Sequence, residues 1–263
     1  MATTTAHTRL RVALGTFVAI EAEARAGVAE AALAAAWDAI QTVERVMHPE
    51  RGGSSLAALN AAAPGTRVEL HPWTWEVLQL SRELHAASAG AFDPCLPESA
   101  GRLDALELIA PHAARLHARL RIDLGGIAQG YAVDRALAAL RDAGAGGGLV
   151  NAGGDLAVFG TRRHRIHCDA GAAAMVVELA DAALASSAAD EPRRPPEHRG
   201  YYHGADVGRV IAGRATVLAP RAVWADGLAK CALVCAPAQC AALLTRFEAR
   251  LLRTQDPAPG RSA

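Results

Sequence analysis

The sequence predicts an α+β fold, in which helices and strands gather in separate stretches of the chain. Helix-like patterns dominate residues 28–88 and strand-like patterns dominate residues 147–219, without the regular alternation of strand and helix that marks a doubly wound sheet. The chain has 263 residues, 51% of them hydrophobic, which is enough to bury a substantial core. No internal repeat of fixed period is visible in the sequence.

The first half begins with an apolar run over residues 10–22, which predicts a strand. From 28 to 47, apolar side chains recur every three or four positions, and this spacing indicates an amphipathic helix. A second helix is expected over 73–88. Between the two helices, SSLAALN predicts a short helix or turn and TRVEL a short strand. The glycine and proline of SAGAFDP, residues 88–94, then predict a loop.

The second half is expected to be mostly β structure with a helix near each end. RLRIDL predicts a strand that leads into glycines, and the helix beyond it places Val133, Leu137 and Leu140 on one face. LVNAGGDLAVFG predicts two strands joined by a tight turn, and HRIHC, MVVEL, RVIAG and RATVLAP predict further strands. A last helix is predicted from 222 to 252, interrupted at Pro237, and a disordered tail over 255–263.

Charge and composition exclude several classes of partner. Lysine and arginine together number 27, as do aspartate and glutamate, so nothing favours nucleic acid or an anionic membrane surface. The five cysteines form no CxxC pair, which is typical of a reducing compartment. No apolar run is long enough to span a membrane, and no signal peptide is recognised, so we expect a cytoplasmic protein.

The stretch DLGGIAQGYAVD, residues 123–134, has three glycines immediately before or within the start of a helix. Such a turn can bring backbone N–H groups and a helix N-terminus against a phosphate. Tight packing of the turn and helix would equally require glycine. The spacing of Gly125, Gly126 and Gly130 does not match a dinucleotide-binding fingerprint. Taken alone, the stretch supports both interpretations.

Two further motifs have an ordinary and a functional interpretation. In WADGLAK, Asp226 and Lys230 lie four residues apart on one helical face, as a surface ion pair would, but a carboxylate is also a ligand that Mg²⁺ prefers. In HRIHC, His164 and Cys168 point to one face of a strand and His167 to the other, so they do not converge on a metal. We interpret these three as ordinary strand residues.

Taken in order, these motifs resemble those of the FAD:protein FMN transferases of the ApbE type. LGTFVAI resembles the opening strand of that family, and SSLAALN its short element that ends in asparagine. SAGAFDP, DLGGIAQGYAVD, NAGGD and ADGLAK resemble its later motifs, and the resemblance extends over most of the chain. It implies a single domain over residues 8–254, with ApbE-like (T-fold-like) sheets, packed helices and a flavin cleft between the halves.

The resemblance also implies an activity. In that family FMN is transferred from FAD to a threonine or serine hydroxyl of a partner flavoprotein, AMP is released, and Mg²⁺ is the metal. Carried over residue by residue, it assigns Gly126, Asp226 and Lys230 to the metal site and His203 to proton transfer. The residues that it places against FAD are Leu14, Ala91, Phe92, Asp93, Asp123, Gln129 and Ala205.

Three departures from the family pattern concern catalysis. Gln129 replaces a lysine or glutamate, Lys230 replaces a threonine, and the segment around His203 lacks a proline and a threonine of the pattern. Lys230 is the only lysine in the chain, and its ammonium could act on the diphosphate or pair with Asp226. An FAD diphosphatase that forms FMN and AMP, and a flavin-binding homologue without catalysis, are the alternatives.

Overall fold

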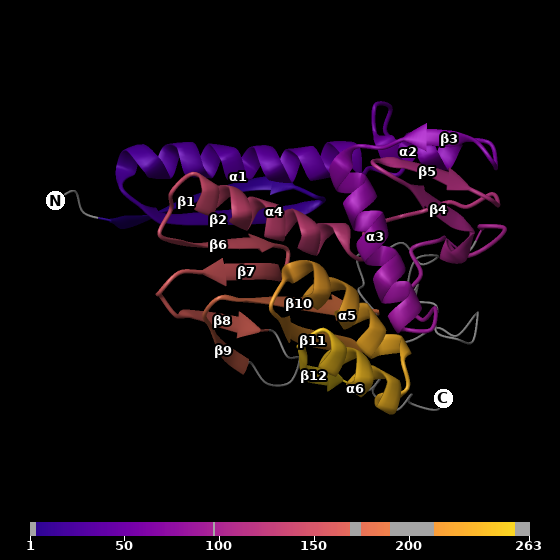
Figure 1. Ribbon diagram of the computed structural model, residues 1–263. Coiled ribbons are helices and arrows are strands. Elements are labelled where there is room, and N and C mark those ends of the chain that lie inside the picture. Colours follow the sequence, from indigo (N-terminus) through magenta and orange to yellow (C-terminus); the bar gives the residue numbers. More distant parts are fainter. Residues whose placement is uncertain (1–3, 97, 169–174, 190–212, 256–263) are drawn as a thin grey trace, which may run out of the picture.

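The computed structural model describes residues 4–96, 98–168, 175–189 and 213–255. A seven-stranded sheet organises the protein, and each pair of neighbouring strands in it is antiparallel (Figure 1). In spatial order its strands are β1 (Thr5–Ala13), β2 (Thr16–Ala24), β6 (Gly147–Ala152), β7 (Asp155–Phe159), β10 (Ala182–Ala188), β11 (Arg214–Ala219) and β12 (Arg250–Gln255).

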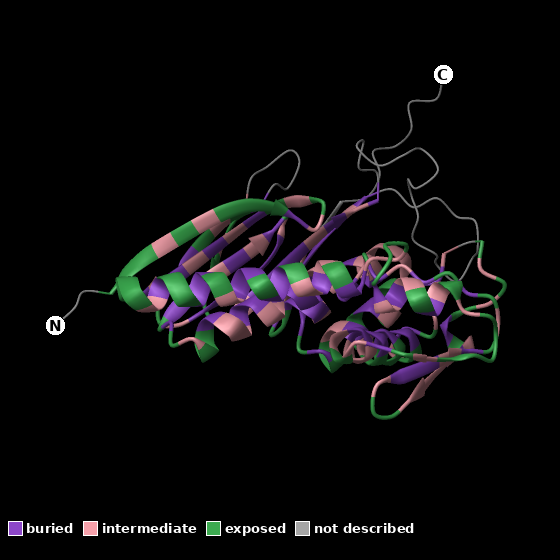
Figure 2. Ribbon diagram, turned by 90° about the horizontal axis from the view of Figure 1, so that it is seen from above, coloured by how far each residue is buried: buried purple, intermediate pink, exposed green. Residues whose placement is uncertain are grey.

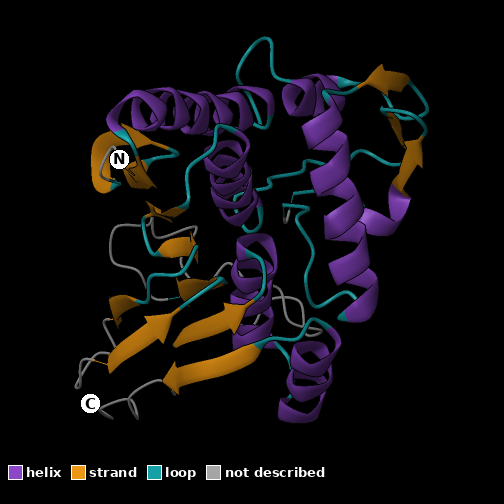
Figure 3. Ribbon diagram, turned by 60° about the vertical axis from the view of Figure 1, so that its left-hand side comes forward, coloured by secondary structure: helices purple, strands orange, loops and turns teal. Residues whose placement is uncertain are grey.

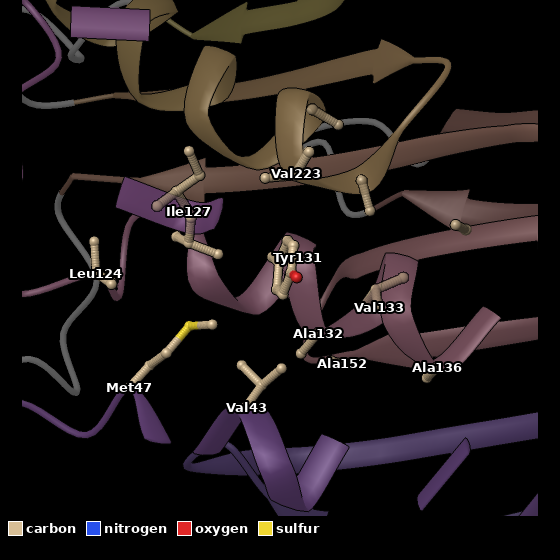
Figure 4. Packing of buried hydrophobic residues seen from close by; sticks show 14 of the residues in the cluster. Val43, Met47, Leu124, Ile127, Tyr131, Ala132, Val133, Ala136, Ala152 and Val223 are labelled. Atoms are coloured by element: carbon tan, nitrogen blue, oxygen red, sulfur yellow. The ribbon is translucent and has the colours of Figure 1, made fainter. Parts of the chain in front are cut away.

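One face of this sheet is covered by helices. These are α1 (Ala26–Val46), α4 (Ala128–Asp142) and α5 (Ala222–Val234), and α6 (Pro237–Arg246) follows at the C-terminal end. Helix α1 turns a buried stripe to the interior and an exposed one to solvent (Figure 2). Val43 of α1 and Val223 of α5 lie on opposite sides of α4, with Tyr131 between them (Figure 4). Helix α4 is therefore the centre of the core.

A smaller unit lies beyond these helices. It contains α2 (Ser55–Ala61), α3 (Pro72–Ala87), the 3-10 helix η1 (Leu103–Ala105) and a three-stranded sheet of β3 (Arg67–Glu69), β5 (Ala113–Leu116) and β4 (Leu106–Ile109). In Figure 3 the helices form a layer between the large sheet and this small one. Ser54 accepts a hydrogen bond from Ala57 at the start of α2, and α3 begins at Pro72, which are the signals expected there. Tyr131 joins the two parts, because its hydroxyl donates to Glu76 of α3 at 2.6 Å.

The other face of the large sheet is partly covered by the hairpin of β8 (His164–Cys168) and β9 (Met175–Leu179). A second, smaller apolar cluster lies beneath the hairpin, and it comprises Leu156, Val158, Cys168, Leu179 and Leu184. Within the described part of the chain, no helix combines the length and the apolar character that a membrane span requires.

The α+β prediction is confirmed, as are the helices expected over 28–47 and 73–88 and after the glycines. The single strand expected over 10–22 is wrong. This stretch is the hairpin β1–β2, which turns at Leu14 and Gly15 with φ values of 53° and 70°. A leucine with positive φ is uncommon, so its side chain gave no turn signal.

Two other predictions about secondary structure are also wrong. RLRIDL forms no regular strand and contributes only an isolated bridge between Cys95 and Ile122. The last helix ends at Arg246, and β12 pairs with β11 instead, because tertiary contacts override a short apolar pattern. Strands β4, β5 and β10 were not predicted. Most of RVIAG, and residues 256–263 of the tail, lie outside the described residues.

Candidate functional site

The glycine turn before α4 is held by side-chain and backbone hydrogen bonds. The amide of Asn60 brackets Ile122, accepting from its N–H at 2.9 Å and donating to its carbonyl at 2.9 Å. The next N–H, that of Asp123, donates to the carbonyl of Pro94 at 2.9 Å. The carboxylate of Asp123 then accepts from the N–H of Gly125 at 2.8 Å, which closes an Asx turn. The turn is thus fixed against the SAGAFDP loop.

The glycines of this stretch have different surroundings. At Gly130 a Cβ would lie 2.7 Å from the carbonyl carbon of Ala222 and 2.7 Å from the Cβ of Asp226. Close packing of α4 on α5 therefore explains this glycine. At Gly126 a Cβ would lie 3.7 Å from Phe92 and 3.9 Å from Lys230, which are ordinary contact distances. Packing does not account for Gly126, which lies between Phe92 and Lys230.

Asp226 and Lys230 form an ion pair on α5, but they are not a surface pair. Asp226 is completely buried, and the side chain of Lys230 is 12% exposed. One carboxylate oxygen of Asp226 accepts from the N–H of Gly130 at 2.9 Å, and the other contacts the ammonium of Lys230. The surface interpretation of this spacing is therefore wrong. Asp226 joins the start of α4 to the ammonium beside Gly126.

Asp155 is a buried carboxylate that sequence reasoning missed. It begins β7, immediately after the two glycines of NAGGD. Burial raises the pKa of its carboxyl well above the ordinary value, and the charge of Asp226 raises this pKa further. Lys230 and a hydrogen bond from the Ser186 backbone lower the pKa. The sequence did offer a signal for Asp155, which is the charged residue that begins the apolar run DLAVF. Burying a charge is costly, so a carboxylate at the start of an interior strand indicates a functional group.

A cavity of about 420 Å³ opens beside these groups, within the range of small-molecule sites. It is bordered by the glycine turn, α5, the β6–β7 turn, β8 and β10. Its lining includes Gly125, Gln129, Asn151, Gly153, Gly154, Asp155, His167, Cys168, Ser186, Ser187, Arg214 and Lys230. Gln129 is held in place, because its amide donates to the carbonyl of Ala152 at 2.5 Å. The bordering positions of Asn151, His167 and Cys168 were not predicted.

The SAGAFDP loop lies against the glycine turn and is held from within. The N–H of Phe92 donates to the hydroxyl of Ser88 at 2.9 Å, and the carboxylate of Asp93 accepts from Arg102 at 2.9 Å and from the N–H of Cys95 at 2.9 Å. Asp93 is therefore engaged in shaping the loop. That Ala91, Phe92 and Asp93 contact FAD stays a prediction, and the same holds for Asp123 and Gln129.

The last three predicted site residues are Leu14, His203 and Ala205, and the structure describes only the first of them. Leu14 lies at the β1–β2 turn, and the adjoining strand β2 accepts a hydrogen bond from Gly153 of the cavity through the carbonyl of Phe17, at 3.2 Å. His203 and Ala205 lie outside the described residues. Their predicted roles in proton transfer and flavin contact stay predictions.

The donor set suits a hard divalent cation. Asp155 and Asp226 are both buried carboxylates, and the charge of Asp226 adds to the effect of burial in raising the pKa of Asp155. The ammonium of Lys230 lowers the pKa of Asp155, but burial, the largest cause, keeps this pKa raised. Carboxylate and main-chain oxygens are the ligands that Mg²⁺ prefers. The residues present therefore fit the magnesium ion implied by the sequence.

Comparisons with known proteins agree with the family resemblance and with the fold. The model of the ApbE family matches residues 14–252. The chain is 25% identical to the FAD:protein FMN transferase of Treponema pallidum, over 92% of this chain and 82% of that protein. The flavinyl transferase ApbE of Pseudomonas stutzeri has a similar fold, with a TM-score of 0.77 at 21% identity, over 92% of this chain and 88% of that chain. The ApbE protein of Thermotoga maritima has a TM-score of 0.76 at 18% identity, over 96% and 97%.

Proposed function

The chain belongs to the ApbE family, and we propose that it transfers FMN from FAD to a threonine or serine hydroxyl of a partner flavoprotein, with release of AMP. The curated relative from Treponema pallidum bears the name of this activity. The proposal extends that activity to the present chain because the motifs around the cavity are retained in order.

The observation that carries the proposal is the convergence of Asp155, Asp226 and Lys230 beside the glycine turn. The turn supplies backbone that a ligand can approach, since Gly126 has no side chain and lies between Phe92 and Lys230. The buried carboxylates supply ligands for a cation, and the ammonium supplies a point charge. A diphosphate that binds a divalent cation matches both features.

Mg²⁺ is the cofactor we propose for this site. Asp226 would hold it through a carboxylate oxygen and Gly126 through its main-chain oxygen, and Asp155, which borders the cavity, would offer a second carboxylate. Lys230 would place its ammonium on the diphosphate at the position where the family pattern has a threonine. Bound there, the ion would neutralise charge that develops as the phosphoanhydride breaks.

The other residues of the site would bind and orient the substrates. We assign flavin contacts to the residues that the family resemblance names, which are Leu14, Ala91, Phe92, Asp93, Asp123, Gln129 and Ala205. His203 would accept the proton of the acceptor hydroxyl, because an imidazole can act as a base near neutral pH. The hydroxyl oxygen forms a bond to the phosphorus of the FMN phosphate, the phosphoanhydride bond breaks, and AMP leaves with the bridging oxygen.

Incubating the purified chain with FAD and Mg²⁺ tests the proposal, with and without an acceptor flavoprotein domain. Release of AMP and a mass increase of one FMN on the acceptor, both dependent on the acceptor, are the expected results. Asp226→Asn should abolish both. Asp142→Asn, at an exposed position near the end of α4, is the matched control and should leave both unchanged.

The alternatives give different outcomes in the same assay. AMP release without acceptor, at the rate seen with it, would identify an FAD diphosphatase and overturn transfer as the main activity. Bound FAD with no AMP under any condition would identify a flavin-binding homologue. That second outcome would point to the departures at Gln129 and Lys230 as its cause.

A further inference from the structure

Three potential metal ligands converge at the opposite end of the large sheet from the cavity. Glu21 and Glu23 are two residues apart on β2, so their side chains point to the same face of the sheet. His164 begins β8, and its Nε2 atom lies near the carboxylate of Glu23. One ligand atom from each of the three lies within 4.8 Å of the other two. No feature of the proposed flavin site uses these side chains.

His164 shows that the cluster is more than a pair of acidic residues. Its side chain is 5% exposed, and its Nε2 atom has no hydrogen-bond partner among the described residues. That atom lies 4.0 Å from a carboxylate oxygen of Glu23, which is too far for a hydrogen bond. A buried polar atom without a partner is costly. Here the Nε2 atom of His164 lies at a distance from the Glu23 carboxylate that a metal ion bound between them would bridge.

A cation already bridges the two glutamates. One terminal nitrogen of Arg162, in the β7–β8 connection, donates to Glu21 at 2.6 Å and to Glu23 at 3.2 Å. The side chain of Arg162 is 51% exposed, so it has room to turn into solvent when another cation takes its place between the carboxylates. Gly147 of β6 leaves space for the cluster, because a Cβ there would lie 2.7 Å from the second carboxylate oxygen of Glu23.

We propose that Glu21, Glu23 and His164 bind a divalent transition-metal ion of the Zn²⁺ class, with Arg162 moving aside. An imidazole nitrogen with two carboxylate oxygens is a donor set that Zn²⁺ accepts, and it differs from the oxygen-only set expected for Mg²⁺. Ligand atoms around tetrahedral Zn²⁺ are about 3.3 Å apart, so the cluster must contract slightly. Both glutamates are partly exposed and can rotate to do so.

The site is distinct from the cavity. Gly147, opposite Glu23, and Gly153, at the cavity, lie six residues apart along β6 and its turn, which corresponds to about 20 Å. In Figure 1 the β7–β8 connection lies at the left-hand end of the sheet and the β6–β7 turn at the other end. Strand β8 connects the two, since His164 begins it and Cys168 borders the cavity. A metal at His164 would therefore fasten the hairpin that forms one cavity wall.

The proposal is tested by calorimetric titration of the full-length chain with Zn²⁺. Bound transition metals are first removed with a chelator, and excess Mg²⁺ is then added to occupy the proposed flavin site. We expect one Zn²⁺ per chain and a higher melting temperature with Zn²⁺ than without. Glu21→Gln, Glu23→Gln and His164→Gln should each weaken binding at least about tenfold, because even a group behind a ligand contributes that much. Arg162→Met should strengthen binding, since it removes the competing cation. His117→Gln is the matched control, because His117 pairs with a single carboxylate, Glu107, elsewhere.

Cobalt gives an independent readout of the ligand type. Co²⁺ at this site should show the visible bands of nitrogen and oxygen ligation, and they should disappear in Glu21→Gln. Thiolate charge-transfer bands would instead assign the metal to a cysteine and overturn the proposal. Absence of Zn²⁺ binding in both the natural chain and Arg162→Met would also overturn it, as would binding that persists in the Glu21→Gln/Glu23→Gln double variant.

Discussion

The two halves of the stretch DLGGIAQGYAVD do different work, although both contain glycine and aspartate. In the helical half, Gly130 has no space for a side chain and Asp134 accepts hydrogen bonds from the first N–H groups of α5. In the loop half, Gly126 has space for a methyl group, and Asp123 accepts from Gly125 and so closes a local turn. The helical half therefore holds α4 against α5, while the loop half presents backbone to the cavity.

Gly130→Ala should have the largest effect on stability and would sharpen this contrast. The new methyl group would meet the Ala222 backbone and the Cβ of Asp226, neither of which can move without shifting α5. We expect a loss of about 3 kcal/mol or more in the free energy of unfolding, at the upper end for overpacking. Urea denaturation measures it.

Gly126→Ala is the matched control for that variant. Its methyl group would make ordinary contacts with Phe92 and Lys230, so the free energy of unfolding should change by less than about 0.5 kcal/mol. If both variants lost the same free energy of unfolding, the proposed difference between the two halves would be wrong.

Asp134→Ala should be next in size. Helix α5 has no capping side chain of its own at Arg221, and Asp134 of α4 accepts from the N–H of Ala222 at 2.7 Å and of Val223 at 3.2 Å instead. Loss of such a cap costs up to about 2 kcal/mol. Thermal unfolding should show a lower melting temperature for Asp134→Ala than for Asp134→Asn, which keeps an acceptor. A melting temperature unchanged in both would contradict the capping role.

Lys230→Thr tests the role of the loop half, because Lys230 lies beside Gly126. If the ammonium acts on the diphosphate, replacing it with a hydroxyl should make turnover depend more strongly on metal. We expect the Mg²⁺ concentration for half-maximal AMP release to rise about tenfold, equivalent to ~1.4 kcal/mol. The titration compares the variant with the natural chain at saturating FAD. An unchanged Mg²⁺ curve would leave Lys230 with its ion pair to Asp226 alone.

The smallest expected effect is a pH dependence in the helical half. Burial raises the pKa of Asp134 above the value of about 3.9 that it has in the unfolded chain, although hydrogen bonds from Ala222 and Val223 oppose the shift. The native state then binds the proton more tightly, so the contribution of Asp134 to stability decreases as pH rises from about 4 through the raised pKa. The asparagine in the Asp134→Asn variant cannot titrate, so the stability of this variant should lack this decrease. Parallel stability curves for the two chains between pH 4 and pH 8 would contradict it.

The sequence predicted the parts of the molecule that depend on local pattern. The stripe of α1, the loop at Gly90 and Pro94, and the helix after the glycines follow from spacing and from turn residues. The hairpin at Leu14 could not be predicted, because a leucine with positive φ carries no turn signal. Strand β12 exists only through its pairing with β11, a contact far along the chain.

The residues of the site also divide into those predicted from local pattern and those that depend on distant contacts. That Asp226 and Lys230 lie together was predicted, because a helix places residues four apart on one face. Their roles at a metal, and that of Gly126, came from the family resemblance and stay predictions. Asp155 was missed because its role arises from convergence with Asp226, 71 positions further along the chain. His164 was assigned to an ordinary strand because its proposed partners, Glu21 and Glu23, belong to a strand near the N-terminus.

The central claim is that Asp226 serves both halves: it accepts from Gly130 and pairs with Lys230, which borders the cavity, and it would hold a metal ion beside Gly126. The most direct test is FAD affinity with and without Mg²⁺, measured by quenching of flavin fluorescence in the natural chain and in Asp226→Asn. Mg²⁺ should strengthen FAD binding in the natural chain and have no effect in the variant, whose amide oxygen can still accept from Gly130. The melting temperature of the variant, measured alongside, shows whether it is folded. An equal response to Mg²⁺ in both proteins would contradict the claim.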